Sequence, residues 1–456
     1  DGVGLRNFAF TDFKSIGEQM GFDITYWNNT IFSLKENLGF NEVKIEDHSV
    51  HPLLSIYSRA RKRVELNISR DKFNDEVYSS YKFPFNYKGI KNSLKSLYTQ
   101  WLIGLYSSEK GVVKLRAKIN KLERSTSKYK YCKAQLEAHK PDLVFCTTQR
   151  ATQSISALLA AQDLGIPTVA FVYSWDNMPK AMQVVETDYY FVWSDLMKQQ
   201  VLQYYPFVEE NQVFVTGTPQ FEPHYDSSLK ESREAFFKEY NLDVNKKYIC
   251  YSGDDETTSP LDQYYLEDLA KAVKSLNRQG ENLGIIYRKC PVDFTSRYDA
   301  VIEANKDIIE VLDPIWKQVG SHWNHVLPTP EDFKMLYNVC EHSEFVTNVC
   351  SSTIFDFVAH NKPCIYYNYE QPQLKKGIRD IGQNYKYVHF RSMPSQEAAV
   401  FCTDKNDLQG LVKQILDGKL SNVETCKKWY EIVAGKTPTQ ASQNIWNTID
   451  SILKNK

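Results

Sequence analysis

Short apolar runs alternate with helical stretches along most of this chain, and they do so in two successive series. The expected strands of the first series are Val43–Ile45, Leu143–Cys146, Thr168–Tyr173, Tyr189–Trp193 and Val213–Thr216. Those of the second are Tyr248–Ser252, Leu283–Arg288, Ile308–Leu312, Glu344–Asn348, Pro363–Tyr367 and Tyr387–Phe390. Strands that alternate with helices form parallel sheets with crossover helices. We therefore predict an α/β protein with two Rossmann-like domains that face each other across a cleft.

A charged, helical stretch followed by a turn separates the two series. We predict an N-terminal domain over residues 1–230 and a C-terminal domain over residues 231–456. Residues 50–140 interrupt the first series, because they are polar and helical with few strand signals, and we expect them to form a helical insertion. Ligands bind parallel sheets at the carboxyl ends of the strands, so we expect the chemistry in the loops that follow the strands.

Composition excludes several classes of protein. The chain has 55 basic and 56 acidic residues, which argues against binding of nucleic acid or another bulk polyanion. Nine cysteines form no C-x-x-C pair and the histidines show no metal-ligand spacing, so we predict no metal site and reduced thiols. Apolar runs all fall short of the roughly 20 residues of a membrane span. We expect a cytoplasmic protein, and we expect a short segment to precede Asp1.

The stretch Lys110–Lys133 is strongly basic, with nine basic residues and one acid. Val112, Leu115, Ile119 and Leu122 recur at helical spacing, which indicates an amphipathic helix with one apolar face. Such a helix is compatible with two structures. It can pack on its own domain with a solvated basic face, or it can rest peripherally on the anionic inner face of a membrane.

The clearest binding signal lies in residues 345–367, which read as a strand, a turn of small residues, a helix and a second strand. Ser351, Ser352 and Thr353 stand where this helix begins. Free backbone N–H groups at a helix start favour an anion, and three hydroxyls add further donors for phosphate oxygens. A simple N-cap would need one such residue. We therefore predict that these residues bind the phosphates of a donor.

Two further loops of the second series supply donor-binding candidates. Arg288 and Lys289 end an apolar strand and can neutralise a leaving diphosphate. Gly253 follows another strand and lets the backbone approach a ligand, and Thr257 can reach the same ligand. The acids at positions 254–256 could hold a metal, but they would also repel phosphate.

In the first series the candidates lie at two strand ends. Trp175 offers an aromatic face, Asn177 a polar group, and Asp176 a carboxylate that can take the proton of an acceptor hydroxyl. An Asx turn leading into Pro179 is the structural alternative. Arg150 ends a neighbouring strand and is a candidate for binding acceptor or phosphate.

The opening residues DGVGLRNF provide a competing base. Asp1 carries the carboxylate, and Gly2 and Gly4 would let the backbone come close to an acceptor.

The C-terminal half resembles that of GT-B glycosyltransferases. Within that superfamily the helix start is similar to the wall-polymer glycerophosphotransferases, with matches at Ser351, Ser352, Phe355, Asp356, Phe357, Lys362 and Pro363. Bacterial sialyl- and Kdo-type transferases carry an H-P motif where this chain has Cys290-Pro291. The segments Ser174–Lys180 and Val213–Phe221 resemble bacterial surface-polysaccharide transferases.

This resemblance implies a GT-B fold whose last helix, Asn444–Leu453, crosses back to the first domain. It implies a metal-independent glycosyltransferase without a cofactor, which moves a sugar from a nucleotide-sugar donor to a saccharide or lipid-linked acceptor. Three alternatives remain open: a CDP-polyol phosphotransferase of the same fold, a nucleotide-sugar 2-epimerase-like isomerase, and a non-catalytic nucleotide-sugar binder.

Overall fold

The computed structural model describes residues 2–30, 32–45, 49–318, 326–375 and 380–455. The chain forms two compact units. Unit 1 comprises Asp1–Phe13 and Pro219–Ile432, and unit 2 comprises Lys14–Thr218 and Val433–Lys456. The division after Thr218 lies near the predicted boundary after residue 230. The two ends of the chain are exchanged, because the N-terminal residues join unit 1 while the last helix, α18 (Ala441–Lys454), joins unit 2.

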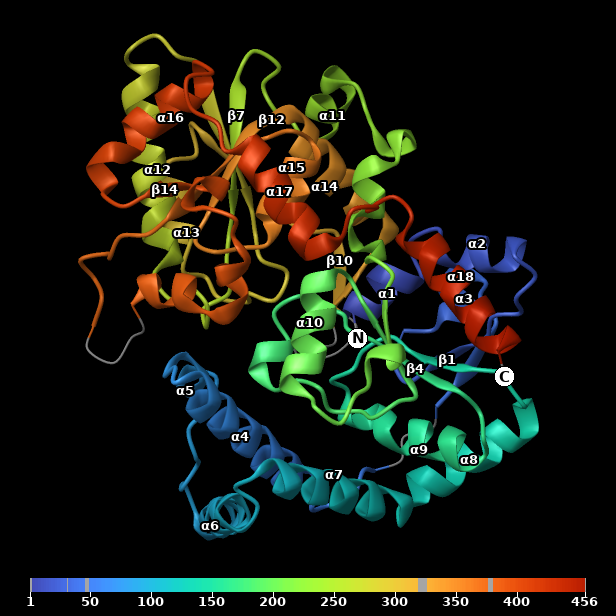
Figure 1. Ribbon diagram of the computed structural model, residues 1–456. Helices are drawn as coiled ribbons and strands as arrows, with labels where there is room; N and C mark the ends of the chain where they lie inside the picture. The colour runs from blue at the N-terminus through green and yellow to red at the C-terminus, as the bar shows by residue number, and fades with distance from the viewer. Residues whose placement is uncertain (1, 31, 46–48, 319–325, 376–379, 456) are drawn as a thin grey trace. The chain divides into compact units, whose positions relative to one another are not determined.

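Unit 1 is built on a six-stranded sheet in the order β14-β13-β12-β7-β8-β9, and every neighbouring pair is parallel (Figure 1). The strands are β7 (Lys247–Ser252), β8 (Leu283–Arg288), β9 (Ile309–Leu312), β12 (Ser343–Asn348), β13 (Cys364–Tyr367) and β14 (Val400–Cys402). When the six strands are numbered by their order in the chain and taken from the β9 edge, they follow the order 3-2-1-4-5-6. This is the doubly wound Rossmann arrangement. An antiparallel pair, β10 (Trp316–Gln318) and β11 (Val326–Pro328), stands apart from the sheet.

Helices cover both faces of this sheet (Figure 1). One core joins the sheet to α12 (Asp262–Asn277), α13 (Asp299–Ala304) and α16 (Leu408–Leu416). On the other face lie α11 (Arg233–Glu239), α14 (Pro330–His342), α15 (Thr353–Ala359) and α17 (Val423–Ala434). Strands buried on both faces read as continuous apolar runs, which is why the sequence revealed them.

Unit 2 contains a four-stranded parallel sheet in the order β3-β4-β5-β6. These strands are Val144–Cys146, Thr168–Phe171, Tyr189–Val192 and Val213–Val215. Helices α9 (Ile155–Asp163) and α10 (Asp195–Tyr204) connect them. The predicted strand at Val43–Ile45 is present as β2 (Glu42–Lys44), but it pairs with β1 (Tyr26–Asn28) in a separate two-stranded sheet.

The predicted helical insertion is present as five helices. They are α4 (Leu54–Phe73), α5 (Val77–Ser80), α6 (Ile90–Leu105), α7 (Glu109–Arg124) and α8 (Ser127–His139). A buried ion network fastens α4 and α7 to the rest of unit 2. Glu65 accepts hydrogen bonds from Arg61 at 2.7 Å and from Arg116 at 2.8 Å. Both arginines also donate to the carbonyl oxygen of Gln183, which lies in the loop after the Asp176 segment.

The basic stretch Lys110–Lys133 forms most of α7 and α8. Val112, Leu115 and Ile119 are buried, so the apolar face of α7 packs within unit 2 while lysines such as Lys114 lie at the surface. Helix α6 of the insertion, by contrast, exposes large apolar side chains such as Ile90 and Leu94. Among the described residues, no helix is long and apolar enough to cross a membrane.

One predicted strand is wrong. Residues 388–392 form a 3₁₀ turn, closed by the N–H of Phe390, which donates to the carbonyl of Tyr387 at 3.0 Å. The adjacent residues His389 and Phe390 are both buried, so the run of apolar character did not reflect a strand. The edge of the sheet is taken instead by β14, which pairs with β13.

Packing between β7 and β8 gives a test of this fold. A Cβ on Gly284 would stand 2.5 Å from Cε1 of the buried Tyr248 ring. We expect Gly284→Ala to lower the free energy of unfolding by roughly 1–3 kcal/mol through overpacking. Gly410→Ala is the control, because nothing lies within 4 Å of its Cβ and α16 should gain about 0.5–1 kcal/mol. Urea unfolding measures both, and equal stability of the two variants would contradict the described packing.

Candidate functional site

The point at which the strand order of unit 1 reverses lies between β7 and β12. These strands are neighbours, yet the chain leaves β7 toward one edge of the sheet and leaves β12 toward the other. Loops that part in this way open a crevice at the carboxyl ends of the two strands, and ligands of doubly wound sheets bind there. The residues at these ends are Ser252 at the end of β7 and Val349–Thr353 after β12.

Three hydroxyl groups meet at this switch point. Thr353 Oγ1 lies 2.8 Å from Ser351 Oγ and 3.2 Å from Ser252 Oγ. Ser351 Oγ also accepts a hydrogen bond from the N–H of Thr353 at 3.3 Å, so it serves as a cap as well. Ser352 is exposed beside them. The sequence analysis identified Ser351, Ser352 and Thr353 but missed Ser252. Because α15 has only seven residues, hydroxyls and N–H groups matter more here than a helix dipole.

The loop after β7 holds the candidates Gly253 and Thr257, and both also have contacts within unit 1. A Cβ on Gly253 would lie 3.0 Å from the ring of Tyr287, so a side chain here would be tightly packed. Thr257 donates its N–H to Asp255 Oδ1 at 2.8 Å and therefore shapes the loop. Between them, burial raises the pKa of Asp254 well above its ordinary value, with Asp262 and Asp255 adding to the shift. A protonated carboxyl group would not repel phosphate.

Arg288 stands at the end of β8 as predicted, but its charge is already matched. Its Nη2 donates to both carboxylate oxygens of Asp332 at 2.9 Å, and both side chains are buried. Lys289 follows it and is half-buried. No sequence pattern indicated this pairing, because Asp332 lies on a later helix. A second cation, Arg6 of α1 (Gly2–Phe8), lies in the field of Asp356 and Asp332, and burial lowers its pKa.

In unit 2 the ends of β3 and β4 bring the acceptor-side candidates together. Gln149 donates to Asn177 Oδ1 at 3.1 Å, which joins the two loops. The carboxylate of Asp176 accepts from Ser174 Oγ at 2.5 Å and from Asn177 Nδ2 at 2.7 Å, and it pairs with Lys180. Asp176 is therefore held in one orientation and is half-buried.

Trp175 and Arg150 are the two other acceptor-side residues at these strand ends. Trp175 is buried, so its ring packs inside unit 2 instead of offering an open face. The guanidinium of Arg150 lies over the ring of Tyr173, 5.1 Å from its centre. The sequence analysis missed Gln149 and Lys180, although both belong to the segments that it singled out.

The opening residues belong to a helix in unit 1, not to the acceptor domain. Gly2 and Gly4 lie in α1, and Gly4 is buried. Asp1, the competing base, lies outside the described residues.

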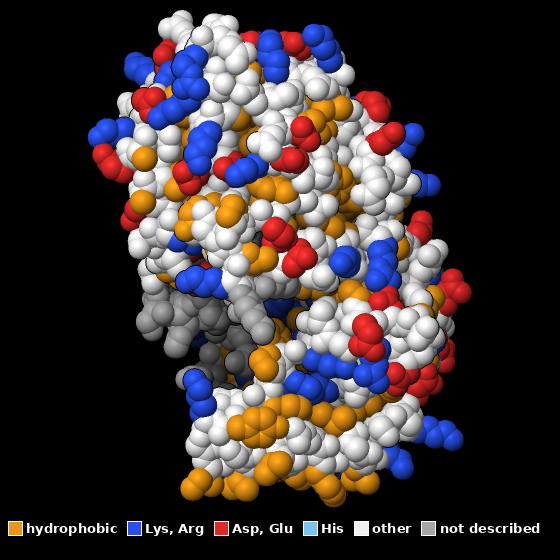
Figure 2. All heavy atoms as spheres, turned by 90° about the vertical axis from the view of Figure 1, so that its left-hand side faces the viewer, with side chains coloured by type: hydrophobic (Ala, Val, Ile, Leu, Met, Phe, Trp, Pro, Cys, Tyr) orange, Lys and Arg blue, Asp and Glu red, His pale blue; other side chains and the backbone are white. Residues whose placement is uncertain are grey.

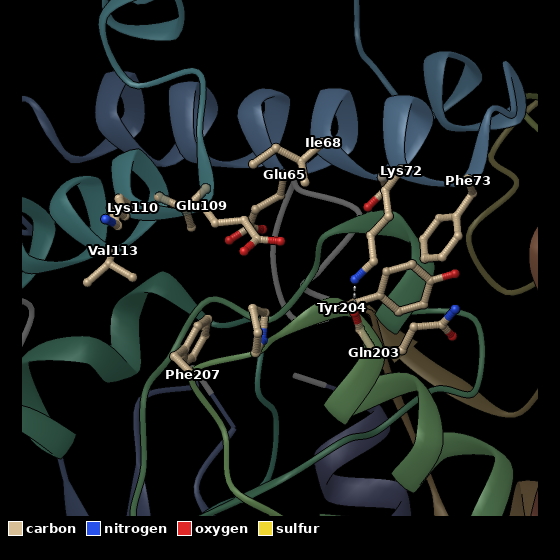
Figure 3. A pocket seen from close by; sticks show the side chains of 13 residues that line it. Glu65, Ile68, Lys72, Phe73, Glu109, Lys110, Val113, Gln203, Tyr204 and Phe207 are labelled. Carbon is tan, nitrogen blue, oxygen red and sulfur yellow. Dashed lines mark hydrogen bonds between the residues drawn. The ribbon is translucent and has the colours of Figure 1, made fainter.

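A cavity of about 260 Å³ lies elsewhere in unit 2, between α4, α7 and α10 (Figure 3). Phe73 and Tyr204 line one end, where Lys72 Nζ donates to the carbonyl oxygen of Gln203 at 3.4 Å. None of the candidate catalytic, donor-binding or acceptor-side residues is among those that line it. The cavity is a packing feature of the insertion and does not change the assignment of the site.

Comparison with known proteins places this geometry in a family. The chain matches the family model "CDP-Glycerol:Poly(glycerophosphate) glycerophosphotransferase" over residues 125–451, well over half of its length. No curated protein sequence matches it.

Three solved structures illustrate the structural similarity. The Staphylococcus aureus MnaA–UDP structure is 17% identical, with 72% of this chain and 78% of that chain covered and a TM-score of 0.43. A putative UDP-N-acetylglucosamine 2-epimerase from Listeria monocytogenes is 13% identical, with 88% and 95% covered and a TM-score of 0.47. The wall teichoic acid polymerase TagF is 14% identical, with 59% and 57% covered and a TM-score of 0.38. Identities and scores this low say nothing about substrate or mechanism. The family match does identify the chain: it belongs to the CDP-glycerol:poly(glycerophosphate) glycerophosphotransferase family.

Proposed function

We propose that this transferase moves a polyol phosphate from a CDP-linked donor to a hydroxyl group of a growing cell-surface polymer. The family match over residues 125–451 carries this proposal, because the family description names that donor and that acceptor. It favours the CDP-polyol alternative over the nucleotide-sugar donor, which the sequence analysis put first.

The proposed step is a displacement at phosphorus. The acceptor oxygen attacks the phosphorus that bears the polyol, a new P–O bond forms, the phosphoanhydride bond breaks, and CMP leaves. The acceptor proton passes to a base, for which Asp176 is the candidate. With a nucleotide sugar the bond that breaks would instead join the anomeric carbon to oxygen, and a nucleoside diphosphate would leave.

The switch point of unit 1 is our candidate for binding the donor diphosphate. Hydroxyls of Ser252, Ser351 and Thr353 converge there, and each can donate a hydrogen bond to a phosphate oxygen. Burial keeps the pKa of Asp254 high, and the Asp254 carboxyl group interacts with the backbone of Val349, which lies in the loop after β12. A neutral carboxyl group at this place is compatible with an anionic ligand, whereas two free carboxylates would oppose it.

The leaving group distinguishes the two classes of donor. We expect CDP-glycerol or CDP-ribitol to raise the unfolding temperature and, with a polyol-phosphate primer, to release CMP. UDP-, GDP- and dTDP-sugars serve as the comparison set under the same conditions. Release of a nucleoside diphosphate from one of them, with no CMP from either CDP-polyol, would contradict the proposal and support a glycosyltransferase.

The roles proposed for Asp176 and for the hydroxyls of the switch point predict a split between turnover and binding. Asp176→Asn should lower kcat by about 10²–10⁴-fold and leave donor affinity unchanged, since a general base acts only in the chemical step. The double variant Ser351→Ala, Thr353→Ala should weaken CDP-polyol binding at least tenfold, as hydrogen bonds to charged groups contribute about 1.5–3 kcal/mol each.

Isothermal titration and steady-state assays separate these effects. Ser395→Ala is the matched control, because Ser395 Oγ caps a different 3₁₀ turn of unit 1. Full turnover in Asp176→Asn would remove this residue as the base. Unchanged donor affinity in the double variant would remove the switch point as the donor site.

We further propose that the insertion rests on an anionic membrane through α6. The exposed apolar side chains of this helix form one stripe, with Ile90 81%, Leu94 62%, Leu97 55%, Trp101 58% and Leu105 57% exposed. The buried positions of the helix are Ser96, Thr99 and Leu102, so most of its apolar side chains face outward. Apolar side chains gather at the lower edge of the face shown in Figure 2, and α6 is the lowest helix in Figure 1.

Charge indicates what this stripe contacts. Lys88, Lys91 and Lys95 are exposed beside it. Leucine and tryptophan with flanking lysines are typical of helices that lie in the headgroup region of a bilayer, where each lysine adds about 1 kcal/mol with anionic lipid. A membrane-borne polymer acceptor would bring the enzyme to the same surface.

Vesicle sedimentation tests this proposal. The chain should bind vesicles that contain phosphatidylglycerol and bind phosphatidylcholine vesicles much less. A triple variant, Ile90→Ser, Leu94→Ser, Trp101→Ser, should lose binding, whereas Val244→Ser, which alters an exposed apolar residue of unit 1, should keep it. A dimer in solution that the triple variant dissociates, without vesicle binding by the unaltered chain, would show that α6 contacts a second copy.

A further inference from the structure

Three elements of unit 1 bring two imidazoles and a thiol together on the α14–α15 side of the sheet. His224 comes from the 3₁₀ turn η4 (Pro219–Tyr225), Cys340 from α14, and His360 from the end of α15. These elements pack against one another, and all three side chains are buried or nearly so. None of them takes part in the proposed transfer.

Each imidazole is backed by a carboxylate. His224 Nε2 lies 2.9 Å from Asp356 Oδ1, and His360 Nδ1 lies 3.0 Å from Glu341 Oε2. The two remaining nitrogens, His224 Nδ1 and His360 Nε2, face each other at 3.2 Å.

Two neutral imidazoles carry too few N–H groups to make all three of these contacts hydrogen bonds. A neutral imidazole carries one N–H, so two neutral rings supply two protons for three contacts. If each ring donates to its own carboxylate, the two facing nitrogens point lone pairs at each other. If one ring instead donates its N–H to the other ring, its second nitrogen has no proton and points a lone pair at its own carboxylate. A cation at the centre removes this deficit, and it is either a further proton or a metal ion.

Chemistry favours the metal ion. Imidazoles that bind metals almost always donate their other N–H to a carboxylate or carbonyl, and both rings are arranged in that way here.

Cys340 supplies a third ligand. Its Sγ and the two facing nitrogens all lie within 4.8 Å of one another. Two nitrogens and one sulfur are a ligand set typical of zinc, with Zn–N of about 2.0–2.1 Å and Zn–S of about 2.3 Å. A spacing of 3.2 Å already suits two nitrogens on one such ion.

We propose that His224, His360 and Cys340 bind one Zn²⁺ in the interior of unit 1. The ion would join η4 to α14 and α15, and Asp356 and Glu341 would orient the two imidazoles. Because the thiolate is the form of cysteine that binds a metal, binding at Cys340 would release the thiol proton. The site is structural and stands apart from the donor hydroxyls, so it does not depend on the proposed function.

Metal binding by the purified full chain tests this assignment. After removal of metals with a chelator, Zn²⁺ is titrated in competition with a chromophoric chelator, and Co²⁺ is added separately as a spectroscopic probe. We expect one equivalent of Zn²⁺ per chain, a higher unfolding temperature, and a thiolate-to-cobalt charge-transfer band. Asp356→Asn should weaken Zn²⁺ binding about 10–100-fold, as loss of such carboxylates does elsewhere.

Variants separate this site from adventitious binding. The double variant His224→Gln, His360→Gln should bind no Zn²⁺ with comparable affinity, and Cys340→Ser should lose the charge-transfer band. Cys426→Ser, which alters a buried thiol outside the cluster, should behave like the unaltered chain. The proposal is overturned if the unaltered chain gives no charge-transfer band or if the double variant binds Zn²⁺ equally well. Absence of zinc binding together with a strongly downfield imidazole N–H resonance would identify the central cation as a proton, which also overturns it.

Discussion

The parallel pairing of β7 with β12 is the constraint on which the candidate donor site depends. Cys250 pairs with Val346 and Tyr251 with Thr347, although almost a hundred residues separate them. Because the connections on either side of this pair leave in opposite directions, the strand ends are not covered by a crossover. Ser252 and Thr353 stand 101 positions apart in the chain, and this pairing alone brings their hydroxyls within 3.2 Å.

The sequence predicted the layers of the fold well and the contacts within the site poorly. Buried parallel strands appear as continuous apolar runs, so β7, β8, β9, β12 and β13 were all found close to their true bounds. The run at Tyr387–Phe390 has a similar composition but forms a 3₁₀ turn. The place beside β13 at the edge of the sheet is taken by Val400–Cys402, which the composition of the two segments does not reveal.

Site residues could be found where a motif surrounds them, and their partners could not. The hydroxyls at Ser351 and Thr353 follow a strand and begin a helix, which is a local signal. Ser252 ends a strand without any such signal, and the pairing of Arg288 with Asp332 joins two elements that share no pattern. The same limit applies to His224 and His360, because ligands that come from separate elements leave no regular spacing in the sequence.

A hydroxyl cluster suits more than one donor. CDP-polyols and nucleotide sugars would present the same kind of diphosphate to the proposed site at Ser351 and Thr353, and they differ in the atom that is attacked. Choice between them must therefore arise from residues that contact the transferred group and the base. This separation of functions explains how one sheet arrangement can serve phosphate transfer and sugar transfer alike.

The exposed apolar stripe of α6 has an evolutionary consequence. Its contacts with the rest of the insertion are made by its buried face, which includes Ser96, Thr99 and Leu102, so exposed positions such as Leu94 and Leu97 contribute little to the stability of the domain. Mutations at Leu94 or Leu97 can therefore accumulate without unfolding the protein. Were α6 to rest on a membrane as proposed, selection at these positions would act on adhesion, and related chains could adjust how long they dwell on a surface while unit 1 stays the same.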